Sequence, residues 1–521
     1  MLIASIPYHN PIDAALQIAL ASEVDGIELR LDYAEHLSIQ DIAALQKQCT
    51  TPLLFTLRKK SQGGYYPHDE KTRIEALMAL SELKPDYMDI EHDTSQDILH
   101  RLSFNTQLIC SYHNHDNTPV DLEAILSSMQ HPAFFGYKIA TQTNSVLDAL
   151  RLLQFSLKHK KSCHSREGGN PFSPGVNLAK SEVDPRLRGD DKKEGWHDEQ
   201  AQHNLTVIGM GTHGQCTRIL SPVIGNFMHY ACIDTESNTA SGQMTIRELR
   251  ETYQIKNLNL KTRIVALLGS PVSHSIGHIF HNRAISYLKE NAVYIKLDVR
   301  PEELESTMTR CRTLPFLGFS VTQPLKEIIV PLLDGIDIAD QPIGAINTIS
   351  VENNQWIGCN TDGKGAWLAL QAYCQPAHQT IVILGAGGAA AAIAHEALLH
   401  NANVMILNRT LDRAKKLAKR LGCQYDTLDT LKSLKNSYCA VINTLPRHDL
   451  LTSDDLSSNI CAMDIIYQPA QTEFIRKAKK AGCVIIPGYD MYIEQALMQL
   501  QRWFNLAPST LTQIKIRSAL K

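Results

Sequence analysis

Residues 107–140, QLICSYHNHDNTPVDLEAILSSMQHPAFFGYKIA, contain one complete strand–helix–strand unit and decide the fold of the first half of the chain. Two apolar runs, over 107–113 and 136–140, flank an amphipathic stretch over 122–129. Strand and helix patterns that alternate at this spacing indicate parallel β/α units. His113 ends the first run and Lys138 lies in the second, so this unit also carries a proton acceptor and an amine nucleophile.

The same alternation recurs on both sides of this unit. Strand-like runs cover 2–7, 26–32, 53–58, 87–92, 205–211 and 230–233, and helix-like stretches cover 11–22, 39–49, 71–83 and 147–158. Eight such units in about 250 residues predict an α/β fold of the TIM-barrel type, (β/α)8, whose active site forms at the carboxyl ends of the strands. We therefore expect one shared site from the polar residues at or just past these strand ends: Glu28, Arg30, Arg58, Glu91, His113 and Lys138.

Residues 162–200 interrupt the alternation. They contain five glycines, three prolines and fourteen charged residues, with almost no apolar periodicity. Such a stretch buries too little surface to offset the entropy of ordering it, so we predict a disordered insertion in the barrel, on the face away from the chemistry. The alternative is a partner-binding loop.

Composition narrows the class of protein. The 521 residues carry a net charge of −3, with 44% hydrophobic and 20% charged residues, as in folded globular proteins. Nothing in this balance favours a nucleic-acid or membrane partner. The twelve cysteines lack metal-ligand spacing, and residues 1–11 lack the basic and apolar segments of a signal peptide. We expect a cytoplasmic enzyme without a metal.

The second half contains a candidate nucleotide site in residues 380–399, TIVILGAGGAAAAIAHEALL. A strand followed by a glycine turn and a helix fits G-x-G-x-x-A, the Rossmann phosphate-binding pattern. The following strand ends in Asn408 and Arg409 where NAD sites carry an acid, which favours NADP, although a capping Asn and solvated arginines remain an alternative. The predicted cofactor contacts are Gly385, Ala386, Gly387, Gly388, Ala389, Asn408, Arg409, Thr410 and Arg413.

Residues 1–255 resemble type I 3-dehydroquinate dehydratases. The resemblance rests on GIELRLD, TLRKKSQGG, SYHNHDNTP, GYKIA, MGTHGQCTRILSP and TASGQ, in this order. It implies that Lys138 forms an imine with the substrate ketone, that His113 removes the C2 proton, and that Arg218 binds the carboxylate. The implied pocket residues are Glu28, Arg30, Arg58, Thr239 and Gln243. Gln62 stands where many members have Glu, and we expect this to tune the activity without abolishing it.

Residues 262–521 resemble shikimate dehydrogenases, through SPVSHS, SVTQPLKE, GAINTI, GCNTDG, DIIYQP and PGYDMYIEQA around the glycine turn. The resemblance implies that Lys326 and Asp362 form the catalytic pair, and that Ser273 and Ser275 bind the substrate carboxylate. It also implies substrate contacts at Thr322, Asn347 and Gln495, with Tyr467 and the cofactor contact Gly488 at a cleft. Ser320, Tyr492 and Ile493 depart from the usual residues.

Together the resemblances predict a bifunctional enzyme of the shikimate pathway, which converts 3-dehydroquinate to 3-dehydroshikimate and reduces this to shikimate with NADPH. Its expected ligands are these small molecules. The predicted domains are a barrel over 1–255, a linker over 256–261, a substrate lobe over 262–362 plus 488–521, and an NADP-binding Rossmann lobe over 363–487. Two alternatives stay open: a quinate dehydrogenase in the second half, or one half that acts as a catalytically weak scaffold.

Overall fold

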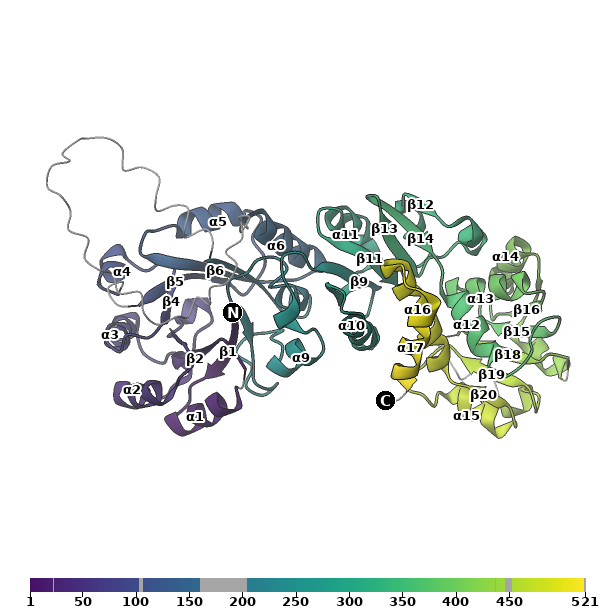
Figure 1. Cartoon of the computed structure of the whole chain (residues 1–521), viewed down its shortest axis with the longest axis horizontal. Coiled ribbons are helices and arrows are strands. Elements are labelled where there is room, and N and C mark those ends of the chain that lie inside the picture. Colours follow the sequence, from purple (N-terminus) through teal and green to yellow (C-terminus); the bar gives the residue numbers. More distant parts are fainter. Residues whose placement is uncertain (22, 103–105, 160–203, 436, 446–451, 520–521) are drawn as a thin grey trace. The chain divides into compact units, whose positions relative to one another are not determined.

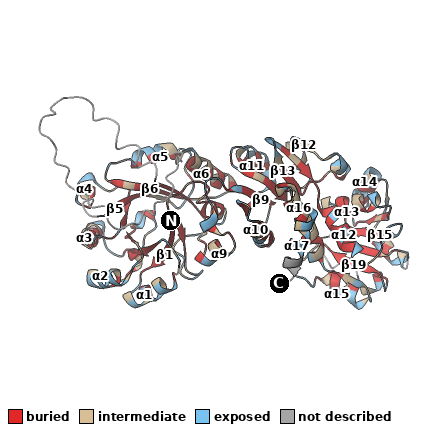
Figure 2. Ribbon diagram, viewed as in Figure 1, coloured by how far each residue is buried: buried red, intermediate tan, exposed pale blue. Residues whose placement is uncertain are grey.

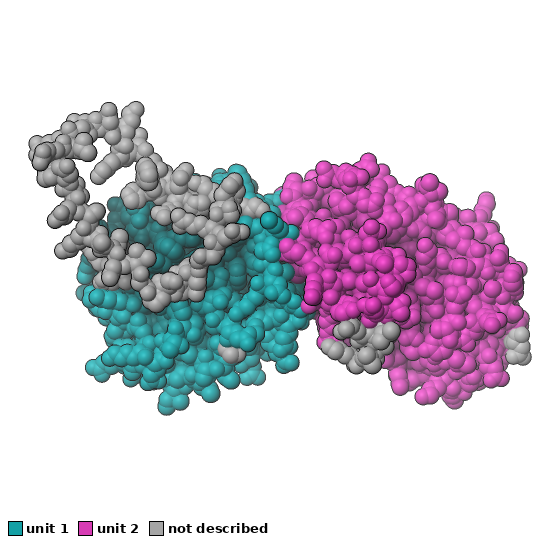
Figure 3. All heavy atoms as spheres, in the orientation of Figure 1, with its two compact units in different colours: residues 1–261 teal, residues 262–521 magenta. Residues whose placement is uncertain are grey.

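The computed structural model describes residues 1–519 apart from 22, 103–105, 160–203, 436 and 446–451. The chain divides into two compact units, residues 1–261 and 262–521 (Figure 3). The predicted insertion over 162–200 lies outside the described residues. Among the helices that the structure describes, none is both long and apolar enough to cross a membrane.

The first unit is a nearly closed barrel of eight parallel strands (Figure 1), which confirms the predicted fold. The spatial order is β7-β6-β5-β4-β3-β2-β1-β8. The strands are β1 (Leu2–Pro7), β2 (Gly26–Arg30), β3 (Leu53–Thr56), β4 (Tyr87–Glu91), β5 (Gln107–Asn114), β6 (Phe134–Gln142), β7 (Leu205–Met210) and β8 (His229–Ala231).

The barrel differs from the prediction at its closing seam. The eighth strand covers 229–231, not 230–233, and pairs with β1 but not with β7. The Asn226 side chain takes the place of a strand partner, since its Oδ1 accepts the Val207 N–H at 3.0 Å and its Nδ2 donates to the Val207 carbonyl at 2.9 Å. The Phe227 N–H also donates to the Leu205 carbonyl, at 2.9 Å. A side-chain amide thus satisfies backbone groups that a longer strand would have paired.

Helices surround the barrel strands, whose residues are largely buried (Figure 2). Polar caps fix where these helices begin: Asn10, Ser38, Asp69 and Asp121 each accept a backbone N–H of the first turn. The short α4 was not among the predicted helices. The helices are α1 (Pro11–Leu20), α2 (Ile39–Gln48), α3 (Glu70–Ser81), α4 (Gln96–Leu102), α5 (Leu122–Met129), α6 (Val146–His159), α8 (Gln215–Ile219) and α9 (Ile246–Glu251).

The second unit begins with a mixed sheet of order β10-β9-β11-β13-β14-β12. β13 runs antiparallel to both β11 and β14, whereas the other pairs are parallel. The strands are β9 (Arg263–Gly269), β10 (Ala292–Asp298), β11 (Phe316–Val321), β12 (Gly335–Ile336), β13 (Thr348–Glu352) and β14 (Gln355–Cys359). The accompanying helices are α10 (Gly277–Leu288), α11 (Leu304–Cys311), α16 (Gly488–Phe504) and α17 (Pro508–Ala519).

A second sheet carries the glycine turn. Its order, β17-β16-β15-β18-β19-β20, is the 3-2-1-4-5-6 order of a Rossmann domain, as predicted. The strands are β15 (Thr380–Leu384), β16 (Asn403–Leu407), β17 (Gln424–Asp426), β18 (Ala440–Asn443), β19 (Cys461–Asp464) and β20 (Val484–Ile486). The helices are α12 (Asp362–Gln371), α13 (Gly388–Leu399), α14 (Leu411–Leu421) and α15 (Glu473–Lys480).

Two glycines let α12 pack closely against α13 and α16. A Cβ on Gly363 would lie 2.4 Å from the Ala392 carbonyl oxygen, and one on Gly365 would lie 2.8 Å from the Gln495 Cβ. Any side chain at either position would push the helices apart. Close packing at these positions therefore fixes the start of α12, where Asp362 lies.

Candidate active sites

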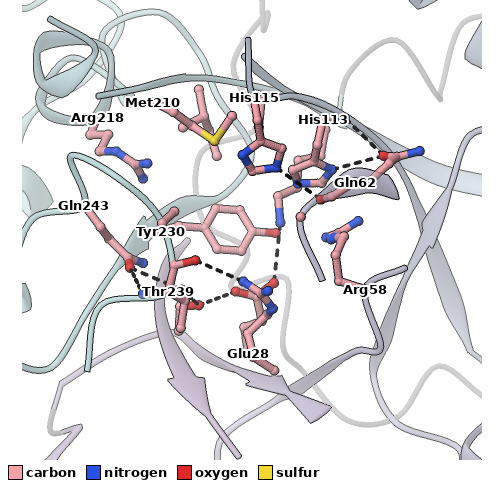
Figure 4. Close-up of a pocket in the computed structure, with 17 residues that line it drawn as sticks. Glu28, Arg58, Gln62, His113, His115, Met210, Arg218, Tyr230, Thr239 and Gln243 are labelled. Carbon is pink, nitrogen blue, oxygen red and sulfur yellow. Dashed lines mark hydrogen bonds and ion pairs between the residues drawn. The ribbon is translucent and has the colours of Figure 1, made fainter. Parts of the chain in front are cut away.

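A pocket of about 500 Å³, counted with its open mouth, lies in the first unit (Figure 4). The structure brings all eight residues that the sequence assigns to the dehydratase site into its wall: Glu28, Arg30, Arg58, His113, Lys138, Arg218, Thr239 and Gln243. Glu91, also expected at this site, is not among the lining residues. It pairs with Arg58 at 3.5 Å and with Arg73 at 3.0 Å, and so it holds the lining residue Arg58 in place.

Lys138 lies in the middle of β6, not at the strand end as expected, and its side chain is only 7% exposed. Its Nζ lies 3.1 Å from Asp89 Oδ2, 3.4 Å from Glu28 Oε1 and 4.1 Å from the centre of the Tyr230 ring. Two carboxylates and an aromatic face offset the cost of burying an ammonium group. The amine is therefore held in a fixed position inside the barrel.

Sequence reasoning missed Asp89, Ser5, Tyr230 and His115. Asp89 precedes Glu91 by two residues, so strand alternation places it on the same face of β4, deeper in the barrel. Ser5 hydrogen bonds to Glu28 and lies 2.8 Å from Thr239 Oγ1. For Tyr230 and His115 no strand pattern distinguished a pocket residue from a core or loop residue.

His113 faces the pocket from β5, the neighbour of β6. It pairs with Ala140, two residues beyond Lys138, so both side chains lie on the inner face. Burial, followed by the positive charges of Arg58 and Lys138, lowers the pKa of His113 well below its ordinary 6.5. The imidazole is therefore neutral at neutral pH and able to accept a proton.

Gln62 orients the His113 ring. Its Oε1 accepts the His113 backbone N–H at 3.1 Å and lies 3.4 Å from Nδ1, which leaves Nε2 without a hydrogen-bond partner among the described residues. Figure 4 shows the Gln62 side chain turned toward the ring. An amide oxygen carries no charge, so it positions the imidazole without raising its pKa as a carboxylate would.

We expect the dehydratase to keep its kcat/KM as the pH falls through 6.5, because His113 protonates only at lower pH. The acid limb of the pH profile, in which kcat/KM falls as His113 becomes protonated, measures this directly. A Gln62→Glu variant should move the limb upward by about one pH unit, since a nearby carboxylate favours the imidazolium. An unshifted limb in this variant, or a wild-type limb at or above pH 6.5, would contradict the assignment.

Arg218 is the unmatched cation of the pocket. It is 5% exposed, forms no ion pair with a described residue, and its buried Nε lacks a hydrogen-bond partner there. Burial lowers its pKa to about 10. By contrast, Arg30 forms two hydrogen bonds with Asp32, at 2.8 and 2.9 Å, and Arg58 pairs with Asp89 at 2.8 Å. Arg218 points into the pocket in Figure 4, so this end of the pocket suits an anion.

In the second unit, Lys326 and Asp362 form an ion pair. Asn347 Nδ2 donates to Asp362 Oδ1 at 2.7 Å and to Gln495 Oε1 at 3.4 Å. The predicted residues Lys326, Asn347, Asp362 and Gln495 thus form one network, to which the structure adds Thr361, 3.0 Å from Asn347 Nδ2. The network holds one amine against a largely buried carboxylate.

The other predicted substrate residues of this unit are more loosely connected. Tyr467 hydrogen bonds to Ser275, whose Oγ also accepts the Gly277 N–H at 3.2 Å. Ser273 is exposed, and Thr322 packs against Gly269.

The three departures from the usual pattern lie in this part of the unit. Ser320 accepts a hydrogen bond from the Tyr294 hydroxyl at 3.0 Å, and Tyr492 packs on Tyr467 with ring centres 4.7 Å apart. Ile493 belongs to the core. All three therefore have packing partners.

The glycine turn between β15 and α13 has the shape that a pyrophosphate needs. Gly385 has φ +115°, and a Cβ there would meet Thr444 Oγ1 at 2.3 Å, whereas a Cβ on Gly387 would meet nothing within 4 Å. The turn is therefore tight on one side and open on the other, at the amino end of a helix. Ala386, Gly388 and Ala389 are half-buried beside it.

Two arginines follow the next strand. Arg409 and Arg413 are exposed, and neither forms an ion pair within the described part of the chain. Asn408 is buried and donates to the Thr410 carbonyl at 2.9 Å. It does not cap α14, whose N-cap residue is Thr410. The guanidinium groups of Arg409 and Arg413 suit an NADP phosphate.

Gly488 lies against the Asp464 carbonyl, where a Cβ would come within 2.3 Å.

Comparison with known proteins assigns a family to each half of the chain. The type I 3-dehydroquinase family model matches residues 3–166 and 194–259. The shikimate dehydrogenase substrate binding domain matches 267–349, and the shikimate / quinate 5-dehydrogenase model matches 368–465. The shikimate biosynthesis protein AroDE of Chlamydia pneumoniae is 33% identical over 510 residues, covering 97% of this chain and 95% of its own length. The chain belongs to the AroDE family.

Two further relatives and one solved structure are similar to all or part of this chain. The chloroplastic bifunctional 3-dehydroquinate dehydratase/shikimate dehydrogenase of Arabidopsis thaliana is 28% identical over 519 residues, covering 94% of this chain and 79% of that protein. The NADP(+) shikimate dehydrogenase of Methanocaldococcus jannaschii is 36% identical over 271 residues, covering 48% of this chain and 95% of its own. A shikimate dehydrogenase crystallised with NADP+ is 34% identical, with a TM-score of 0.46, covering 50% of this chain and 97% of that one.

Proposed function

We propose that this AroDE family member dehydrates 3-dehydroquinate to 3-dehydroshikimate in the first unit and reduces that product to shikimate with NADPH in the second. The observation that carries the proposal is the buried Lys138 amine, in one pocket with a neutral His113 and an unmatched Arg218. A ketone with a carboxylate fits this set: the amine attacks the carbonyl, and the guanidinium binds the anion.

In the first reaction, His113 takes a proton from the Lys138 ammonium, the amine adds to the ketone carbon, and His113 returns the proton to the hydroxyl, which leaves as water and gives an imine. His113 then removes the C2 proton through Nε2, and the imine accepts the electron pair. Loss of the C1 hydroxyl, protonated by His113, forms the double bond, and hydrolysis returns Lys138. Arg218 holds the carboxylate throughout, and Glu28, Arg30, Arg58, Thr239 and Gln243 surround the ring. No step needs a metal.

In the second unit, Lys326 gives a proton to the developing alkoxide, and Asp362 holds the lysine in place. Bound NADPH supplies the hydride. Ser273, Ser275 and Tyr467 would bind the substrate carboxylate end, and Thr322, Asn347 and Gln495 its hydroxyls. The turn from Gly385 to Ala389, with Gly488 nearby, would hold the nucleotide, with Arg409 and Arg413 on its 2′-phosphate.

The direct test incubates the purified full-length protein with 3-dehydroquinate and NADPH. Shikimate should form, with one NADPH consumed for each molecule. Failure to form 3-dehydroshikimate would overturn the first proposal, and its accumulation without reduction would overturn the second. Oxidation rates on shikimate and quinate decide between the two polyols, and a faster rate on quinate would contradict the proposed substrate.

Arg218→Met should raise the KM for 3-dehydroquinate by about 100-fold, the cost of roughly 2–3 kcal/mol for a lost charge-assisted hydrogen bond. The reductase activity should not change. Arg218→Lys keeps the charge but cannot form a bidentate pair with a carboxylate, so its KM should lie between those of the wild type and Arg218→Met. Steady-state kinetics on both substrates measure the effect, and an unchanged KM in Arg218→Met would remove Arg218 from the anion site.

Arg409→Ala and Arg413→Ala should each raise the KM for NADPH by about tenfold, because each removes a cation from the 2′-phosphate. The KM for NADH should stay constant, since NADH lacks that phosphate. Arg476→Ala removes an exposed arginine of the same lobe and serves as the control. Equal effects on both nucleotides would place the arginines elsewhere than at the phosphate.

A further inference from the structure

Gln62, which lines the dehydratase pocket, is contacted by three histidines. Its Oε1 accepts the His113 backbone N–H at 3.1 Å and lies 3.4 Å from His113 Nδ1. Its backbone carbonyl lies 3.2 Å from His115 Nε2 (Figure 4). On the other side of the amide, Gln62 Nε2 lies 3.4 Å from Nδ1 of His92, which directly follows β4. One buried side chain thus joins His92 to His113.

The backbone N–H of His113 fixes which way the Gln62 amide faces. A backbone N–H can only donate, so the amide oxygen lies toward it and the NH₂ group lies toward His92. An NH₂ group also can only donate, so His92 Nδ1 accepts this bond and the ring carries its proton on Nε2. The contacts therefore define a neutral His92 in a single tautomer.

The same orientation sets the tautomer of His113. Because Gln62 Oε1 can only accept, His113 Nδ1 carries the proton, which leaves the lone pair on Nε2. A reversed amide would place its NH₂ group against His113 Nδ1, so that Nδ1 would have to accept and Nε2 would have to carry the proton. The reversed amide would thus remove the base that the dehydratase needs.

His92 is not among the residues that line the pocket, so it acts on the pocket through Gln62. Its backbone N–H donates to the Ser111 carbonyl at 3.0 Å, and its ring packs edge-on against the Tyr112 ring, with centres 5.1 Å apart. Among the described residues, Gln62 Nε2 bonds to no acceptor other than His92 Nδ1. Loss of this acceptor would leave a buried donor unsatisfied in the amide orientation that His113 requires.

We propose that His92 is a positioning residue of the dehydratase, which holds the Gln62 amide so that His113 keeps its lone pair on Nε2. This role rests on the dehydratase activity proposed above. Without the His92 acceptor, the Gln62 amide turns more freely, and His113 spends less time in the tautomer that accepts the C2 proton. The loss falls on the chemical step and not on substrate binding, because His92 lies outside the pocket wall.

The test compares His92→Leu with His92→Asn. Leucine removes the acceptor, whereas the asparagine side-chain oxygen can take the place of Nδ1, and both variants lose the ring that packs on Tyr112. His92→Leu should lower the dehydratase kcat by about tenfold with an unchanged KM, and His92→Asn should keep kcat within about twofold of the wild type. Steady-state kinetics on 3-dehydroquinate measure both values.

A Gln62→Leu background shows whether His92 acts through the amide. With no amide to orient, His92→Leu and His92→Asn should have equal kcat in this background. The proposal fails if His92→Leu alone keeps the wild-type kcat, if His92→Asn loses as much as His92→Leu, or if their difference persists without the amide.

A measurement on the wild-type protein separates this role from the activity on which it rests. With nitrogen-labelled histidine, NMR at a pH where the rings are neutral should show His92 protonated on Nε2 and His113 protonated on Nδ1. Loss of the signal in His92→Asn or His113→Asn assigns each ring. A proton on His92 Nδ1 would overturn the proposal even if a variant does not fold. Absence of 3-dehydroshikimate with the wild type would instead overturn the proposed function, and the tautomer result would be unchanged.

Discussion

Replacing Lys138 with methionine should lower the dehydratase kcat by about 10⁴-fold or more, because the reaction loses its covalent nucleophile. Methionine fills a similar volume, and the two carboxylates that face the amine, Asp89 and Glu28, remain. The reductase activity of the same protein should stay constant, which shows that the second unit is folded. Separate assays on 3-dehydroquinate and 3-dehydroshikimate measure both activities.

A trapping experiment checks that the lysine acts as a nucleophile. Borohydride added during turnover should reduce the imine and fix the substrate carbon skeleton on Lys138. Lys59→Met, which replaces a lysine ion-paired to Asp93 outside the pocket, serves as the control and should trap normally. Trapping at another residue, or none at all in an active wild-type preparation, would refute the covalent mechanism.

Replacing Lys326 with methionine should lower the reductase kcat by about 10²- to 10⁴-fold, the range that general acid catalysis contributes. The variant loses the proton donor, and Asp362 loses its ion-pair partner, whereas Asn347 still donates to Asp362. The dehydratase should be unaffected. Rates of NADPH oxidation at saturating 3-dehydroshikimate measure this loss.

Lys364→Met is the matched control, since this exposed lysine lies on α12 only two residues from Asp362. It should keep the full reductase rate. If Lys326→Met also keeps that rate, Lys326 is not the proton donor. If both variants lose it equally, a general charge effect and not a specific donor explains the result.

The periodicity of the sequence was enough to predict the barrel and the Rossmann sheet, because alternating strands and helices at fixed spacing leave few arrangements. The periodicity was less able to predict how far a residue lies from the carboxyl end of its strand, and so how deep in the barrel. Lys138 was expected at a strand end and lies at the centre of β6, and Asp89 was passed over for Glu91 although only Asp89 reaches the amine. Depth depends on the stagger of the strands, which no single strand reveals.

The unmatched state of Arg218 also could not be predicted. Arg30, Arg58 and Arg218 look alike in the sequence, and only the folded chain shows that the first two have carboxylate partners. The turn from Gly385 to Ala389 was easier to predict, because its residues are consecutive and its shape depends on local backbone conformation. Contacts between distant segments, such as Gly365 against Gln495, follow only from the packing of whole helices.

The seam at Asn226 bears on how the protein behaves at high concentration. An open strand edge offers a row of unpaired backbone groups on which a second molecule can extend the sheet, and this is a route to aggregation. The Asn226 amide occupies such groups at Val207, near the middle of β7. The backbone groups of Val207 at the seam are therefore not available to a strand of a second molecule.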